Sequence, residues 1–108
     1  MHGAWLAPGA HLDLVGAFNL AMREADDDAL RRSRVHVDTP AALEEGGDVA
    51  IALRDGAIAH DRVRGDLFGL CRGEVPGRTS ADEITLFKSV GAAIEDLAAA
   101  MAVMAARG

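Results

Sequence analysis

Three consecutive residues, Ser89, Val90 and Gly91, have the types and spacing best suited to chemistry in this chain. The pattern from Ser80 to Gly91 predicts a buried strand that delivers a serine and a glycine to the start of a helix. A serine at that position is a good N-cap, and the first backbone N–H groups of a helix have no partner within the helix. Because these groups and the helix dipole attract negative charge, we predict that this junction binds an anion.

The elements around this junction are predicted to alternate between short strands and helices. Apolar runs predict strands at residues 11–16, 34–38 and 49–53 and within 80–88, and helical spacing predicts helices at 26–33, 39–45, 62–72 and 90–106. Pro40 suits the first position of a helix, and Gly73 suits the position just after one. Alternation of this kind predicts an α/β fold.

The composition limits the size and the partners of the protein. A length of 108 residues allows one domain or less, with a core built from Leu, Val, Ile, Met and many Ala. A net charge of −6 argues against nucleic acid and against an anionic membrane surface as partners. The single cysteine, Cys71, excludes an internal disulfide, and residues 1–8 do not resemble a signal peptide. We therefore expect a cytoplasmic protein.

The remaining polar residues do not form a recognisable metal or nucleotide motif. The four histidines have no spacing that places two on one helix face, so we predict no metal site. Asp26, Asp27 and Asp28 are interpreted as a helix cap, and Ser80 as a turn residue rather than a nucleophile. The chain contains no GxGxxG and no P-loop sequence, so its own motifs cannot hold a dinucleotide pyrophosphate.

Several segments resemble the ornithine cyclodeaminase/mu-crystallin family of NAD(P)-dependent enzymes. The most specific matches are Pro8–Phe18 with Met22–Glu24, and Ser80–Gly91, which occur in the family's order. Further matching segments lie between them, at Val35–Thr39, Glu45–Asp48 and Gly77–Ser80. The resemblance implies a C-terminal piece of a family member, without the substrate domain and the first half of the Rossmann-type domain that carries the glycine-rich loop.

The resemblance also implies roles for residues at two places in the chain. The loop Val15, Gly16, Ala17 and Phe18 would lie against the nicotinamide end of NAD or NADP, and Ser89 would contact the same cofactor. Val90 and Gly91 would lie on the substrate side, where their N–H groups suit the carboxylate of a small amino or imino acid. The substrate-binding lysine and arginine of the family lie outside this chain, so no catalytic residue is named in it.

Two positions depart from true ornithine cyclodeaminases, which have an aspartate in place of Phe18 and a lysine in place of Met22. A phenylalanine cannot transfer a proton. The resemblance is therefore to relatives that reduce cyclic ketimines such as Δ1-pyrroline-2-carboxylate, with Phe18 shielding the site from water. Cyclodeaminase or alanine-dehydrogenase-like activity of an intact protein is the alternative within the family.

The resemblance divides the chain into two parts. Residues 1–88 are expected to form the second half of an NAD(P)-binding Rossmann-type domain, and residues 89–108 a helix that returns to the absent substrate domain, where the family builds its homodimer. Ile94, Leu97, Met101 and Met104 follow helical spacing, with alanine at most other positions. We expect such a piece to be inactive alone. The alternative of another class is a non-catalytic remnant or interaction module that uses this helix.

Overall fold

A single parallel sheet organises the computed structural model, which describes residues 1–108. Its strands are β1 (His11–Leu14), β2 (Ser33–Val37), β3 (Val63–Asp66) and β4 (Ile84–Lys88), in the spatial order β1-β4-β2-β3. Every neighbouring pair is parallel, so all four strands end at the same edge of the sheet. The α/β fold with a parallel sheet is confirmed.

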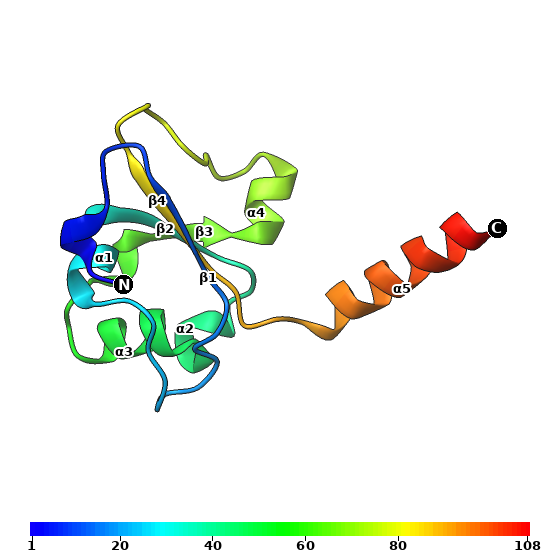
Figure 1. Cartoon of the computed structure of the whole chain (residues 1–108), viewed down its shortest axis with the longest axis horizontal. Helices are drawn as coiled ribbons and strands as arrows, with labels where there is room; N and C mark the ends of the chain where they lie inside the picture. Colours follow the sequence, from blue (N-terminus) through cyan, green and yellow to red (C-terminus); the bar gives the residue numbers. More distant parts are fainter.

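Four short helices lie between the strands, and a longer fifth helix follows β4. They are α1 (Asp27–Arg32), α2 (Ala42–Glu45), α3 (Gly47–Arg54), α4 (Leu67–Arg72) and α5 (Ala93–Arg107), with 3-10 turns at Gly3–Trp5 and His60–Arg62. The caps expected for two of them are present: Asp26 accepts from the Ala29 N–H ahead of α1, and Gly73 adopts a left-handed φ of 73° after α4. Figure 1 shows the order of these elements along the chain.

The hydrophobic core lies on one face of the sheet. Alternation along the strands places Leu14, Val35 and Leu86 on this face, and all three are buried. They form one cluster with residues of α1 and α3 and of the adjoining loops, namely Ala25, Ala29, Leu30, Val49, Ala52 and Ile58. The cluster fixes the two long strands β2 and β4 against these helices.

The opposite face of the sheet is covered mainly by the segment that follows α4. His36 on β2 is buried, and its Nε2 lies 3.1 Å from the carbonyl oxygen of Pro76. Burial lowers the pKa of His36 below its ordinary value of 6.5, since desolvation disfavours the charged ring. The neutral imidazole therefore serves as a packing group on this face.

The strand predicted at residues 49–53 is wrong, because this segment is the middle of α3. A short apolar run such as Val49–Leu53 fits a buried strand and a buried helix equally well. Here Gly47, Asp48, Val49, Ala50 and Ala52 are all buried in the helix. Asp48 in its first turn also suits the positive end of the helix dipole.

The helix predicted at residues 62–72 is two elements, the edge strand β3 and the helix α4. Its second half was predicted correctly. The change occurs at Asp66, whose side chain accepts a hydrogen bond from the Gly69 N–H at 2.9 Å and so caps α4. The N-terminus of α2 also differs from the prediction, since its N-cap is Ala41 and Pro40 lies just before the helix.

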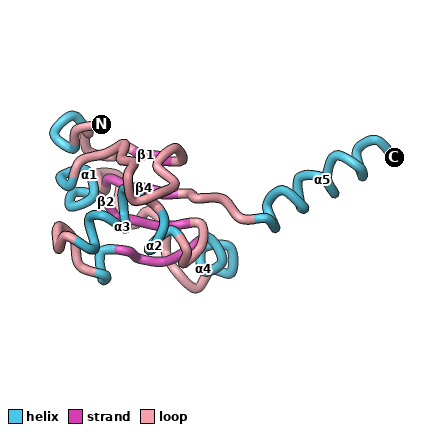
Figure 2. Tube along the Cα trace, turned by 90° about the horizontal axis from the view of Figure 1, so that it is seen from below, coloured by secondary structure: helices cyan, strands magenta, loops and turns pink.

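The last helix extends away from the rest of the molecule. Figures 1 and 2 show, in two perpendicular views, that α5 points outward from the sheet after a short connecting segment. None of its residues is buried. It begins at Ala93 rather than at the predicted residue 90. No helix in the chain combines the length and the apolar character needed to span a membrane.

Candidate functional site

The carboxyl edge of the sheet brings the two predicted site segments together. Residues 15–18 follow the end of β1 and residues 89–91 follow the end of β4, and these two strands are neighbours. The Ser89 N–H donates to the carbonyl oxygen of Leu14 at 2.9 Å, which joins the segments directly. In open parallel sheets, ligands bind outside the carboxyl ends of the strands, so this edge is the candidate site.

Asp38, directly after β2, organises the segment 89–91. Its Oδ2 accepts from the Ser89 hydroxyl at 2.9 Å, from the Val90 N–H at 3.0 Å and from the Gly91 N–H at 2.8 Å. Its Oδ1 accepts from the Thr39 N–H at 2.8 Å. Burial raises the pKa of this carboxyl, but the hydrogen bonds from Gly91 and Ser89 outweigh burial and hold the pKa below 3.8.

These contacts correct the predicted anion site at the start of the last helix. Ser89 is not an N-cap, because α5 begins at Ala93 and its N-cap is Ala92. The N–H groups of Val90 and Gly91 are not free, since both donate to Asp38. The carboxylate that these donors attract is thus one of the chain's own. Gly91 has a φ of +85° and open space where a Cβ would lie.

The loop after β1, residues 15–18, is exposed except at Ala17. Val15 and Phe18 are exposed at 61% and 60%, whereas Ala17 between them is fully buried. The Ala17 N–H donates to Glu24 Oε1 at 3.0 Å, and its carbonyl oxygen accepts from the Gly47 N–H at 3.0 Å. Both polar groups of Ala17 are therefore held, which leaves the side chains on either side of it facing outward.

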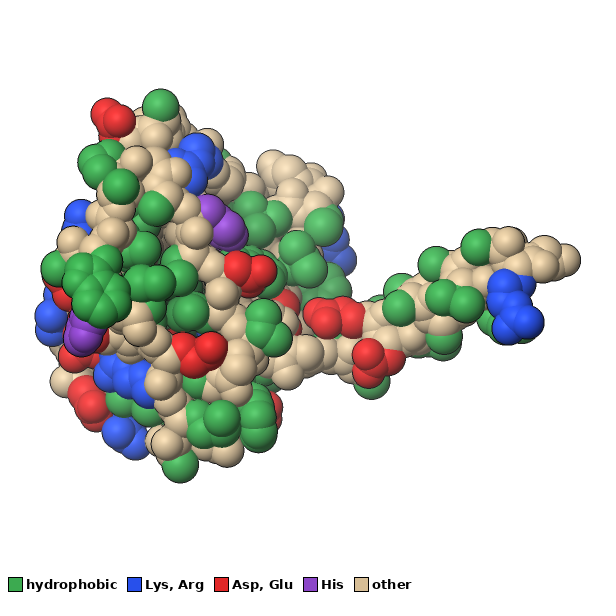
Figure 3. Space-filling view, in the orientation of Figure 1, with side chains coloured by type: hydrophobic (Ala, Val, Ile, Leu, Met, Phe, Trp, Pro, Cys, Tyr) green, Lys and Arg blue, Asp and Glu red, His purple; other side chains and the backbone are tan.

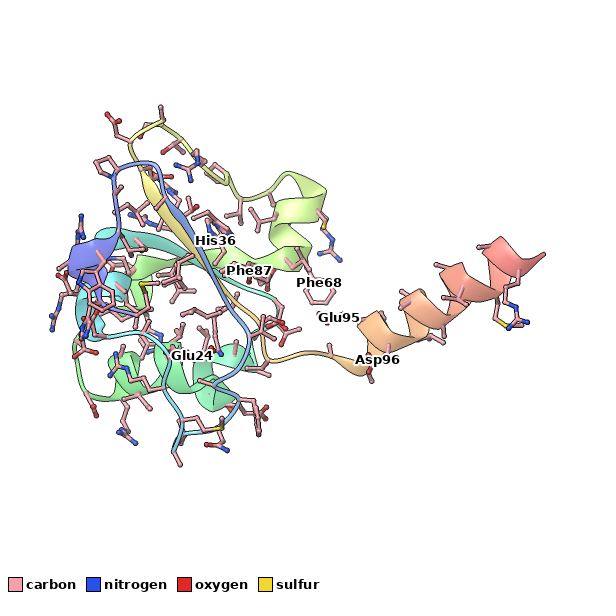
Figure 4. The ribbon with its side chains drawn as sticks, viewed as in Figure 1. Glu24, His36, Phe68, Phe87, Glu95 and Asp96 are labelled. Carbon is pink, nitrogen blue, oxygen red and sulfur yellow. The ribbon has the colours of Figure 1, made fainter.

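A small cavity lies next to Asp38. It has a volume of about 220 Å³ and is lined by α4, the end of β2 and the start of α5, chiefly through Asp38, Leu67, Phe68 and Ile94. Figure 4 shows Phe68 of α4 directed toward the start of α5, where Glu95 lies. The candidate site thus combines the hydrogen-bonded carboxylate of Asp38 with an apolar cavity. Small-molecule sites usually combine polar and apolar groups in this way.

The sequence reasoning missed the acidic and basic side chains that support the site. Asp38 could have been found as the first charged residue after an apolar strand, and Lys88 as a charged residue that continues the core-facing alternation of Ile84 and Leu86. Asp48 lies just before the strand predicted at residues 49–53, so its burial in the first turn of a helix was not expected. No group of three His, Cys, Asp or Glu side chains is arranged to hold a metal ion.

The carboxyl ends of β1 and β4 carry several groups that suit a dinucleotide. Exposed Val15 and Phe18 offer an apolar surface, Ser89 offers a hydroxyl, and Gly91 leaves space for close approach. The chain has no glycine-rich loop to hold a pyrophosphate. The residues present fit one wall of a dinucleotide site.

Comparison with known proteins identifies the family of the chain. The family model described as ornithine cyclodeaminase/mu-crystallin family matches residues 1–106. The chain belongs to this family. The chain is also 45% identical over 96 residues to the Δ1-pyrroline-2-carboxylate reductase of Paracoccus denitrificans, and the match covers 88% of this chain and 30% of that protein. The chain therefore spans about a third of the length of such relatives.

Two solved structures of relatives show the same arrangement of elements. One is the Thermococcus litoralis Δ1-pyrroline-2-carboxylate reductase in complex with NADH and L-proline, with a TM-score of 0.84 and 38% identity over 89% of this chain and 30% of that one. The other is an archaeal alanine dehydrogenase dimer with bound NAD, with a TM-score of 0.87 and 31% identity over 94% of this chain and 32% of that one. Both of these similar structures thus hold a nicotinamide cofactor.

Proposed function

We propose that this chain is the C-terminal portion of an NAD(P)-dependent imino-acid reductase that acts on a cyclic ketimine of the Δ1-pyrroline-2-carboxylate type. The proposal is supported by the similarity to reductases of that name and by the likeness to a structure holding NADH and L-proline. The chain corresponds to about a third of such proteins, so it contributes part of the site and is inactive alone.

The observation that carries the proposal is the meeting of residues 15–18 and 89–91 at the carboxyl ends of two neighbouring strands. In the proposed site, Val15, Gly16, Ala17 and Phe18 form the surface against the nicotinamide, and Ser89 contacts the cofactor. Val90 and Gly91 lie on the substrate side. Since their N–H groups serve Asp38, they act by shaping the wall, and the open face of Gly91 leaves room for the substrate.

Phe18 separates this proposal from a cyclodeaminase. Its side chain is apolar and lies on the exposed face of the loop. A bound dihydronicotinamide supplies a hydride, and the chain's own residue at this position excludes water from the reacting carbon. We propose that the proton that completes the reduction of a C=N bond comes from a group outside this chain, because Phe18 cannot transfer one and Asp38 is an acceptor for Ser89, Val90 and Gly91.

The division into two parts belongs to the same proposal. Residues 1–88 form the second half of the cofactor-binding domain, and residues 89–108 lead to a helix that packs on the substrate and dimerisation domain of the intact protein. The exposed apolar side chains of α5 in Figure 3 support this assignment. The outer edge of β1 also has no neighbour in the sheet, which leaves a strand edge for the first half of the domain. The intact protein is proposed to be a homodimer.

A segment exchange tests the proposed function. Residues 1–106 of this chain replace the matching segment of the Thermococcus litoralis reductase, and reduction of Δ1-pyrroline-2-carboxylate is followed by the loss of NADH or NADPH absorbance. We expect a reductase with measurable turnover. Introducing Phe18→Asp should lower kcat/KM by about tenfold or more, since a buried charge would be placed against the ring. Leu20→Asp, on the same loop, is the matched control and should have little effect.

Parallel assays separate the alternatives. Turnover of ornithine to proline would favour a cyclodeaminase, and NAD reduction by L-alanine would favour an alanine-dehydrogenase-like enzyme. A folded chimera that turns over none of these substrates would favour the non-catalytic alternative, in which the chain acts through α5. Unchanged ketimine reduction in Phe18→Asp would contradict the position of Phe18 at the nicotinamide.

A further inference from the structure

Lys88 is the only lysine of the chain, and its side chain is fully buried at the carboxyl end of the central strand β4. Its Nζ lies 3.6 Å from Asp48 Oδ2, and both side chains are completely excluded from solvent. The same Nζ lies 4.0 Å from Glu24 Oε1. Neither the Lys88 ammonium nor Asp48 Oδ2 makes a hydrogen bond within the chain. Burial of charge at such cost needs a reason, since an apolar replacement is often as stable.

The two carboxylates near Lys88 hold the loop that follows β1. Asp48 Oδ1 accepts from the N–H groups of Glu24 and Ala25, each at 2.8 Å. Glu24 Oε1 in turn accepts from the Ala17 N–H at 3.0 Å. Figure 4 shows Glu24 on the stretch of chain that passes beside α2 and α3. The start and the end of the loop are thus fastened to one pair of acidic groups.

Close packing leaves this arrangement little freedom. A Cβ on Gly16 would lie 3.0 Å from the carboxylate of Glu24, and a Cβ on Gly47 would overlap the carbonyl oxygen of Met22. The Gly47 N–H also donates to the carbonyl oxygen of Ala17. Two carboxylates converge on the loop, and a buried cation lies within 4.0 Å of both of them. Lys88 provides that cation from the strand that also leads to Ser89.

We propose that Lys88, Asp48 and Glu24 are positioning residues that fasten the loop 15–25 to the end of β4, and so set where Val15 and Phe18 face the cofactor. Their effect on catalysis rests on the proposed function, whereas their effect on the loop does not. None of the three touches the reacting atoms. They act through Ala17, whose two backbone polar groups they and Gly47 hold.

Amide hydrogen exchange of the 108-residue chain tests this inference without any ligand. In Lys88→Met, the exchange of the Ala17, Glu24 and Ala25 amides should accelerate at least about tenfold, because local opening of the loop becomes easier. The amides of Val35 and Leu86 in the sheet should accelerate much less. A uniform acceleration of all slow amides, or none, would overturn the proposal, since a merely structural cation would act through global unfolding.

Two further variants keep the test decisive. Asp48→Asn retains an acceptor for the loop amides but places a neutral group beside Lys88, so it should reproduce the loop-selective effect if Lys88→Met does not fold. Arg34→Met removes the Arg34–Glu83 ion pair of 2.9 Å at the opposite edge of the sheet and should leave the Ala17 amide unchanged. Acceleration of Ala17 exchange in Arg34→Met by the same factor would count against a specific role for the Lys88 cluster.

The segment exchange then separates this inference from the proposed function. In the chimera, Lys88→Met should lower kcat/KM for the ketimine by about tenfold, and Arg34→Met should leave it within about twofold. Loop-selective exchange combined with unchanged kcat/KM would uphold the fastening of the loop and overturn its place at the cofactor. Unselective exchange would overturn the fastening itself, whatever the activity.

Discussion

Apolar side chains of the same kinds are buried in the sheet region and exposed to solvent on helix α5. In the sheet region, Leu30, Val35 and Leu86 are exposed by no more than 1%. In α5, Leu97, Met101 and Met104 are exposed by 59%, 64% and 70%. The difference lies in the neighbours, because the core side chains of the sheet, α1 and α3 pack on one another, whereas no residue of α5 is buried and only its start lines a cavity with α4. Hydrophobic spacing therefore identifies a face that packs, but it does not identify the partner.

A pair of leucine substitutions gives the largest expected contrast. Leu86→Ala should lower the free energy of unfolding by about 2 to 5 kcal/mol, because it removes core volume in the central strand. Leu97→Ala should change it by no more than about 0.5 kcal/mol, because the side chain is exposed. Urea unfolding followed by circular dichroism measures both values. A large loss in Leu97→Ala would show that α5 packs against the chain in solution.

Asp38 lies where the two regions meet, and its replacement should have an intermediate effect. Asp38→Asn should cost about 1 to 3 kcal/mol, since four donors lose a charged acceptor. Its folded pKa is lowered, so its stabilisation is present above the unfolded value of 3.8 and is lost as pH falls through the folded pKa. The difference between Asp38→Asn and the unaltered chain should therefore shrink below about pH 4.

Thermal melts from neutral pH down to about pH 2 would measure this difference. Asp26 and Glu83 contribute in the same direction in both proteins. The N–H groups of Ala29 and Gly3 lower the pKa of Asp26 to about 2. Burial raises the pKa of Glu83, but its contacts with Arg34 and Thr79 prevail and lower it to about 2. A gap between the two proteins that persisted unchanged at low pH would contradict the role of Asp38 as an ionised acceptor.

Removal of α5 should have the smallest effect on stability. Deletion of residues 92–108 should change the unfolding free energy of the sheet region by less than about 1 kcal/mol, because no residue of α5 is buried. The helical signal should fall by less than a full helix of that length, since an isolated helix of 15 residues is marginal in water. Differential scanning calorimetry of the full and the shortened chain measures the change in stability. A marked drop in Tm on deletion would contradict the conclusion that α5 does not pack on the sheet region.

The sequence predicted most of the sheet but not all of the helices around it. The strands β1, β2 and β4 were placed within a few residues, since each is a short apolar run with clear turn residues beside it. The segment 49–53 was assigned the wrong structure, because burial of nearly all of its residues erases the difference between helical and strand spacing. The edge strand β3 was included in a helix, because Val63 and Leu67 also fit helical spacing.

The candidate site was predicted as two segments without the groups that hold them. Residues 15–18 and 89–91 could be named from the sequence, and the parallel sheet accounts for their meeting. The contacts of Asp38 could not be derived, because they join residues 51 to 53 positions apart. The alternation of Ile84, Leu86 and Lys88 points to the core face, but the partners of Lys88 could not be derived, since Glu24 and Asp48 lie 64 and 40 positions away in the sequence.

The strand order has a consequence for how these 108 residues fold during synthesis. β4 is the last strand to be synthesised, yet it lies between β1 and β2. Until residues 84–88 leave the ribosome, β1 has no hydrogen-bonding neighbour in this chain, and its contacts must then form across more than seventy residues. Pairings of that span form slowly and leave strand edges exposed in the meantime. A version of this chain that ends before residue 84 should therefore be insoluble when expressed alone, because β1 would then lack its neighbour β4.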